Sequence, residues 1–139
     1  MKAGLEIGAV AEVTARVSEE MFAQFEGNIV HRAYSTVAMV YHMEWASRKI
    51  ILPYLEEHKE GVGGAVSVKH IAPTAEGTTV YVKAVVTKVT QNVIVTAVEI
   101  WNESGLIGVG EVKQGIVLKE TMENRLKQSI IKQESNSCS

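Results

Sequence analysis

Apolar and polar residues alternate along residues 11–17, and this period of two predicts a first strand. A short amphipathic turn follows it. Helical periodicity then begins at Ser35 or Thr36, either of which can serve as the N-cap, and it continues to about 54–57. Pro53 lies near the end of this long helix and can kink its last turn.

The second half of the chain has the pattern of a sheet. β-branched residues with a period of two predict four strands joined by short connections, at 65–71, 78–90, 92–102 and 106–119. Short connections favour antiparallel neighbours. A helical pattern follows over 120–132. The whole pattern predicts an α+β fold, in which an antiparallel sheet of five or more strands packs on one long central helix.

Length and composition predict one domain over residues 1–132, followed by a polar and disordered tail at 133–139. A chain of this length buries about two-thirds of its unfolded surface and needs no disulfide or metal to fold. One sheet covers only one face of its helix and leaves strand edges free. We therefore expect a homodimer, with a tetramer as the alternative.

Charge and cysteine content exclude several classes of protein. The net charge is −2 and Lys and Arg form no run, so we expect no nucleic-acid partner. No stretch reaches the ~20 apolar residues of a membrane span, and Glu6 and Glu12 interrupt any signal-like run. The expected location is the cytoplasm. Cys138 is the single cysteine, and the four histidines lack metal-ligand spacing, so we expect no metal site.

Three side chains in this pattern can carry chemistry: Thr36, Glu44 and His70. Thr36 lies at the helix start, where free backbone N–H groups favour an anion or a polarised oxygen. Glu44 falls on or beside an apolar stripe, where a carboxylate must be paired, hydrated or carried with a raised pKa. That stripe consists of Val37, Val40, Tyr41, Ile51 and Leu55. His70 ends the first strand after the helix. A hydroxyl, a carboxylate and an imidazole can together activate water and hold an oxyanion.

Each candidate also has a purely structural interpretation. Thr36 can be a plain N-cap. Glu44 can pair with Arg48 one turn later on the helix surface. His70 can be a hydrogen-bonded histidine at a strand end.

A helix followed by a four-strand meander resembles the hotdog fold. The resemblance becomes specific at five tracts: 43–46, 53–55, 63–70, Pro73 and 77–80. These tracts resemble the fluoroacetyl-CoA thioesterase family of hotdog hydrolases, over about 33–119. The Thr eight residues before the Glu, and the His 26 residues after it, are the selective part of the pattern.

The resemblance implies roles for individual residues. In that family a Thr, a Glu and a His form the catalytic set, which corresponds to Thr36, Glu44 and His70. Gly63 corresponds to a glycine near the acyl group, and Gly64 beside it is a further candidate for substrate binding. From the residues alone, these two glycines fit either close approach of a ligand or a strand entrance.

The chain departs from the family pattern at two positions. Val30 stands where the fluoroacetyl-specific enzyme has an aromatic lid residue, so it is a candidate substrate-binding residue. Gln114 corresponds to an Arg near the end of the last strand. Because pocket shape sets the acyl group while the catalytic set determines the reaction, we expect thioesterase chemistry without fluoroacetyl selectivity.

The resemblance therefore implies a hotdog acyl-CoA thioesterase that hydrolyses a short-chain acyl-CoA to the free acid and CoA. It needs no cofactor, since coenzyme A is part of the substrate. One alternative is a non-catalytic acyl-CoA-binding protein on the same fold, because fold does not settle function. Another is an interaction protein in which Glu44 merely pairs with Arg48.

Overall fold

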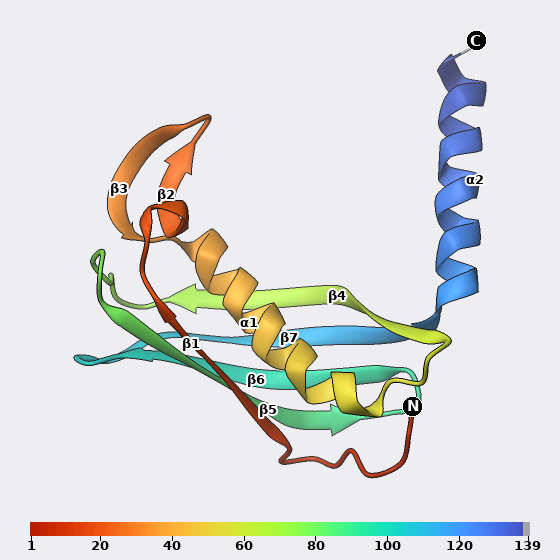
Figure 1. Cartoon of the computed structure of the whole chain (residues 1–139), viewed down its shortest axis with the longest axis horizontal. Helices are drawn as coiled ribbons and strands as arrows, with labels where there is room; N and C mark the ends of the chain where they lie inside the picture. The colour runs from red at the N-terminus through yellow and green to blue at the C-terminus, as the bar shows by residue number, and fades with distance from the viewer. Residues whose placement is uncertain (138–139) are drawn as a thin grey trace.

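Five antiparallel strands form the main sheet, in the order β1-β5-β6-β7-β4. The computed structural model describes residues 1–137, with side chains as far as residue 131. The strands span Val10–Arg16 (β1), Lys59–His70 (β4), Thr79–Val89 (β5), Val93–Asn102 (β6) and Gly105–Leu118 (β7). One long helix, α1 (Thr36–Ile51), crosses one face of this sheet (Figure 1). The α+β fold predicted from the pattern is confirmed.

The core lies between α1 and the sheet. The helix contributes residues three and four apart, and the strands contribute alternate residues, as their two periods require. Fully buried members include Met39, Met43, Ala46, Ile51, Val80, Val82, Ile94, Val98, Ile100 and Val112. The sequence had indicated another helical stripe, and this was wrong for Val37 and Tyr41, which are 76% and 56% exposed. Glu44 lies on that exposed face.

The start of the helix matches the sequence pattern, whereas α1 ends at Ile51, before the 54–57 that the pattern predicted. Ser35 is the N-cap, and its hydroxyl oxygen accepts a hydrogen bond from the backbone N–H of Ala38. After α1, a 3-10 turn, η2 (Leu52–Tyr54), contains Pro53 and turns the chain toward β4.

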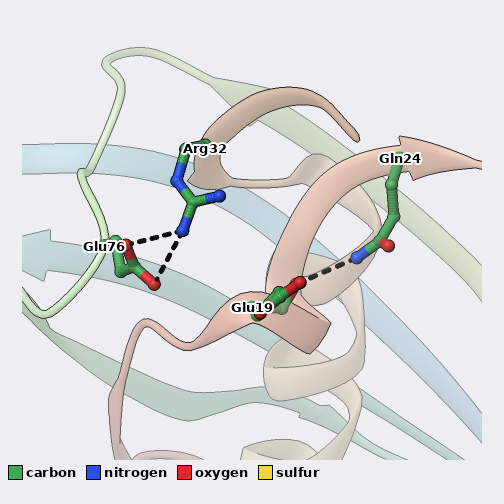
Figure 2. Close-up of polar contacts among 4 residues, drawn as sticks. All are labelled: Glu19, Gln24, Arg32 and Glu76. Atoms are coloured by element: carbon green, nitrogen blue, oxygen red, sulfur yellow. Dashed lines mark hydrogen bonds and ion pairs between the residues drawn. The ribbon is translucent and has the colours of Figure 1, made fainter. Parts of the chain in front are cut away.

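A second, two-stranded sheet precedes α1, and the sequence pattern does not predict it. After the 3-10 turn η1 (Glu19–Met21), β2 (Phe22–Phe25) and β3 (Asn28–Tyr34) form a hairpin that projects beyond the main sheet (Figure 1). Figure 2 shows two contacts that hold it: the Gln24 amide donates to the Glu19 carbonyl at 2.9 Å, and Arg32 pairs with Glu76 at 3.2 Å. The second contact ties the hairpin to the segment before β5.

Two boundaries also differ from the prediction. β4 starts at Lys59, so Gly63 and Gly64 lie inside the strand, at an irregularity of its pairing with β7. The C-terminal helix α2 (Lys119–Ser137) extends beyond Lys132 and projects away from the sheet (Figure 1). Of the tail predicted to be disordered, residues 138–139 lie outside the described part of the chain, and the proposed division at residue 132 stays a prediction.

Candidate active site

Thr36 and His70 meet at one end of the molecule. Thr36 is the first residue of α1 and His70 is the last residue of β4. The Thr36 Oγ1 atom lies 2.9 Å from His70 Nδ1, a hydrogen bond between positions far apart in the sequence. Two of the three predicted catalytic residues are therefore in direct contact.

The other ring nitrogen of His70 is buried without a hydrogen-bond partner among the residues that the structure describes. A buried polar atom in this state costs free energy unless something else satisfies it, such as a ligand, water or another chain. His70 thus has one nitrogen bonded to Thr36 and a second, buried nitrogen that lacks a partner among the described residues.

Glu44 lies two turns further along α1 and faces β4 at Gly63. A Cβ atom on Gly63 would come within 2.9 Å of Glu44 Oε1, which is closer than real Cβ contacts. The glycine therefore leaves the space that the carboxylate occupies. Since an α-helix rises 1.5 Å per residue, Glu44 lies about 12 Å along the axis from Thr36. Within one chain, Glu44 is separate from the Thr36–His70 pair.

Arg48 does not serve as the partner of Glu44. Its guanidinium instead contacts Glu60 on β4 at 2.9 Å, and it also donates to the Gly61 carbonyl at 3.4 Å. The hydrogen bond from Arg48 lowers the pKa of the Glu60 carboxyl below its ordinary value. The structure therefore does not support the interpretation that Glu44 pairs with Arg48 on the helix surface.

Pockets open on both parts of the site. One of about 540 Å³ lies between the hairpin and the end of β4, and its lining includes Tyr34, Thr36 and His70. Another of about 580 Å³ lies between η1, β2 and the start of α1, and Thr36 lines it too. Glu44 lines a third, of about 460 Å³, together with Tyr41, Trp45, Arg48, Lys49 and Leu52.

The remaining predicted residues are more scattered. Val30 lies on β3 and is 54% exposed. A Cβ on Gly64 would contact the Lys113 carbonyl of β7 at 3.5 Å, so Gly64 does not face Glu44 as Gly63 does. Gln114 is buried directly across from Gly63, and its amide nitrogen has no partner within the described side chains.

Sequence reasoning missed a buried pair next to the site, Tyr34 and His42, whose side chains are hydrogen-bonded at 2.6 Å. No periodicity distinguishes such a pair, because it joins the end of a strand to the middle of a helix. Within the described residues, no cluster of His, Cys, Asp and Glu is arranged to hold a metal. No described helix has the length and hydropathy needed to cross a membrane.

Comparisons with known proteins agree with this architecture. Residues 17–120 match the family model described as FlK, fluoroacetyl-CoA-specific thioesterase. A Thermus thermophilus protein described as a thioesterase superfamily member is 39% identical, with a TM-score of 0.91 over 96% of this chain and 98% of that one.

A mutant of the fluoroacetyl-CoA-specific thioesterase FlK is 25% identical, with a TM-score of 0.84 over 92% of this chain and 99% of that one. A hot-dog-like protein from Thermanaerovibrio acidaminovorans, 21% identical over 88% of this chain and 91% of that one, shares the fold with a TM-score of 0.83. No curated protein sequence matches the chain. The chain therefore belongs to the FlK family of hotdog thioesterases, as its sequence motifs had indicated.

Proposed function

We propose that this protein hydrolyses short-chain acyl-CoA thioesters to the free acid and CoA, using Glu44, Thr36 and His70. The observation that carries the proposal is the 2.9 Å hydrogen bond between Thr36 and His70, beside a pocket, in a chain of the thioesterase family. A related FlK structure, 25% identical, was solved with fluoroacetate and CoA, which supports CoA as the thiol carrier.

Glu44 has two possible roles in the reaction. As a general base, it takes a proton from water while the water oxygen bonds to the thioester carbonyl carbon. As a nucleophile, it bonds to that carbon itself and forms a mixed anhydride, which water then hydrolyses to restore the carboxylate. In both routes the carbon–sulfur bond breaks, and the leaving thiolate takes up a proton to become CoA.

The start of α1 at Thr36 stabilises the developing oxyanion of the thioester, and His70 handles the proton transferred to the leaving thiolate or taken from water. The first N–H groups of α1 have no acceptor within the helix itself, so those of Thr36 and Val37 can stabilise a developing oxyanion. The Thr36 hydroxyl orients His70 through Nδ1. His70 acts as a base toward water or as the acid that protonates the thiolate.

The separation of Glu44 from His70 points to a site shared by two copies. β4 is an edge strand, paired within the chain only on its β7 side. Along β4, His70 lies beside the start of α1 and Gly63 lies beside Glu44. If two β4 edges pair antiparallel about a two-fold axis, with Gly63 opposite the partner's His70, then Glu44 faces the partner's Thr36–His70 pair.

The exposed face of α1 supports the same assembly. Val37, Tyr41, Trp45 and Leu52 lie on one side of the helix and are 47–76% exposed in the single chain. Glu44 and Arg48 belong to the same face and contact β4, so this face borders the free edge. A second copy paired along β4 would cover part of it.

The acyl preference should be broad. Val30 is an exposed aliphatic residue on β3, at the position where the family pattern has an aromatic lid residue. A single methylene in an apolar pocket changes transition-state binding by only ~1–3 kcal/mol. We expect acetyl-, propionyl- and butyryl-CoA to be hydrolysed, with no strong selection of fluoroacetyl over acetyl.

A panel of acyl-CoA thioesters tests the proposal. Release of free thiol should be observed with the short-chain members, and kcat/KM for fluoroacetyl- and acetyl-CoA should differ modestly. Absence of thiol release from the entire panel would reject hydrolysis. A fluoroacetyl preference of thousands-fold would leave hydrolysis intact but reject the role given to Val30.

A further inference from the structure

Tyr34 and His42 form a buried pair at the junction of β3 and α1. They are 2% and 5% exposed, and the Tyr34 hydroxyl lies 2.6 Å from His42 Nδ1. Their rings stack, with centroids 5.7 Å apart at 16°. The rings of Tyr41 and His42 also meet edge-on, with centroids 5.4 Å apart at 73°. The pair is therefore held by one hydrogen bond and by ring packing.

Burial determines the protonation of both side chains. It raises the pKa of the Tyr34 hydroxyl, which keeps its proton and donates the hydrogen bond. It lowers the pKa of His42, which is neutral and accepts at Nδ1. The proton of the neutral imidazole is thus on Nε2.

Tyr34 connects this pair to the candidate active site. Its ring meets the ring of His70 edge-on, with centroids 6.4 Å apart at 71°. Its backbone N–H donates to the Thr74 carbonyl at 2.9 Å, so the main chain is fixed as well. Tyr34 also directly precedes the helix cap Ser35 and then Thr36. Tyr34 therefore contacts His70 through its ring, and its backbone fixes the start of α1, from which Thr36 bonds to His70.

We propose that Tyr34 and His42 are positioning residues, which hold the His70 imidazole in the orientation where Thr36 bonds Nδ1 and Nε2 is free. His42 locks the Tyr34 ring through the hydroxyl, and the ring edge in turn restricts rotation of His70. The catalytic consequence rests on the proposed thioesterase activity, while the effect on His70 itself does not.

Tyr34→Phe in the full chain tests the pair, because it keeps the ring and removes the hydroxyl. We expect kcat to fall about 10- to 100-fold with KM nearly unchanged, since misplacement of a catalytic group costs rate rather than binding. His42→Leu should cause a similar loss. His42→Asn places an acceptor near the position of Nδ1 and should recover part of the rate.

Thr96→Val is a matched control. The Thr96 hydroxyl makes a buried hydrogen bond of 2.7 Å with Ser47 of α1, and its loss should lower the melting temperature in the same way. Because this bond lies in the core between α1 and β6, kcat should not change. If Tyr34→Phe reduces kcat no more than Thr96→Val does, the positioning role is rejected.

Nitrogen-15 NMR of histidine-labelled protein gives a readout that needs no activity. In the wild type, the His70 ring should show one dominant tautomer. In Tyr34→Phe and His42→Leu, its signals should shift toward the tautomer average or broaden, while Thr96→Val leaves them in place. Unchanged His70 signals in both variants would overturn the proposal. If the wild type hydrolyses no thioester, the proposed function fails and this measurement still decides the positioning role.

Discussion

Gly63 shows how a single missing side chain shapes this site. Its backbone passes so close to Glu44 that a methyl group would lie 2.9 Å from the carboxylate oxygen. Glu44 is itself exposed in the single chain, so its charge is hydrated and needs no buried counter-ion there. The carboxylate is thus accessible to a substrate, and the missing side chain at Gly63 leaves space beside it. A base or a nucleophile needs both.

Glu44→Gln removes the charge while keeping the size of the side chain. We expect kcat to fall at least ~10²-fold, the lower end of what a general base contributes. The melting temperature should change little, because the substitution keeps the size of the side chain at a position that is exposed in the single chain. Thiol release from a short-chain acyl-CoA and thermal unfolding measure the two effects. Near-wild-type turnover would remove Glu44 from the mechanism.

His42 should make stability depend on pH. Burial lowers its pKa below the ordinary value of 6.5, which it regains on unfolding. Between these two pKa values the unfolded chain binds a proton that the folded chain does not. The free energy of unfolding therefore falls as the pH drops below about 6.5, down to the folded pKa.

Urea unfolding of the wild type and of His42→Asn between pH 7.5 and 5.5 measures this effect. The variant should show a weaker loss of stability across the window. Glu56 and Glu60, whose pKa values are also lowered, lose their stabilising charge only as the pH falls below their ordinary value of 4.5. Equal pH dependence in both proteins would refute the assignment to His42.

The sequence selected candidate site residues but did not predict how they are arranged. Residue type and spacing selected Thr36, Glu44 and His70, and two of these are in contact. The apolar stripe proposed around Glu44 was wrong for Val37 and Tyr41, because Met39 and Met43 face the sheet in their place, whereas Ile51 is buried as proposed. Both faces of α1 carry apolar residues, so periodicity alone could not say which one enters the core.

At the scale of elements, the pairing of β7 with β4 depends on a glycine. A Cβ on Gly110 would overlap the backbone carbonyl oxygen of Ser67 on β4 and would crowd the Met43 side chain. The backbone of a paired strand cannot move aside without breaking its hydrogen bonds. By contrast, a Cβ on Gly115 would meet only ordinary contacts, the nearest being Val62 at 3.6 Å.

Gly110→Ala should therefore destabilise the protein by roughly 1–3 kcal/mol, the usual cost of forcing extra atoms into a packed site. Gly115→Ala, on the same strand, should cost far less and serves as the control. Denaturant unfolding of the two variants compares them directly. Equal stability of the two would show that β4 and β7 can separate locally at little cost.

The β2–β3 hairpin was the element that the sequence did not reveal. Its strands are short, and the pairing shifts register at two points, so period-two alternation is weak. Within the hairpin, the Arg32 guanidinium lies over the Phe22 ring at 5.1 Å. A tertiary contact also holds the hairpin, since Arg32 pairs with Glu76, 44 residues later in the sequence. Partners that lie this far along the chain leave no local signal. By contrast, the four later strands are 10–14 residues long, and each was predicted within a few residues except for the early start of β4.

At the scale of the whole molecule, one chain presents an incomplete surface. β4 has a free edge, α1 exposes an apolar face, and Leu126, Ile130 and Ile131 of α2 are 58–65% exposed. Glu44 and the Thr36–His70 pair lie at different places along that free edge. In an antiparallel two-fold dimer, Glu44 of each chain would lie beside the partner's Thr36–His70 pair, which gives two complete sites. The dimer would also cover part of the exposed surface. The tracts recognised in the sequence implied the catalytic set, but they could not show that one chain separates its members.

Complementation between two inactive variants tests the shared site most directly. Glu44→Gln and His70→Ala are prepared separately, then unfolded, mixed in equal amounts and refolded, and thiol release from a short-chain acyl-CoA is measured. If Glu44 acts with the partner's Thr36 and His70, each mixed dimer has one complete site, and activity should return to about a quarter of the wild-type value. If all three residues act within one chain, no mixed dimer has a complete site. Activity that stays at the level of the separate variants, with mixed dimers demonstrated by mass spectrometry, would contradict the shared site.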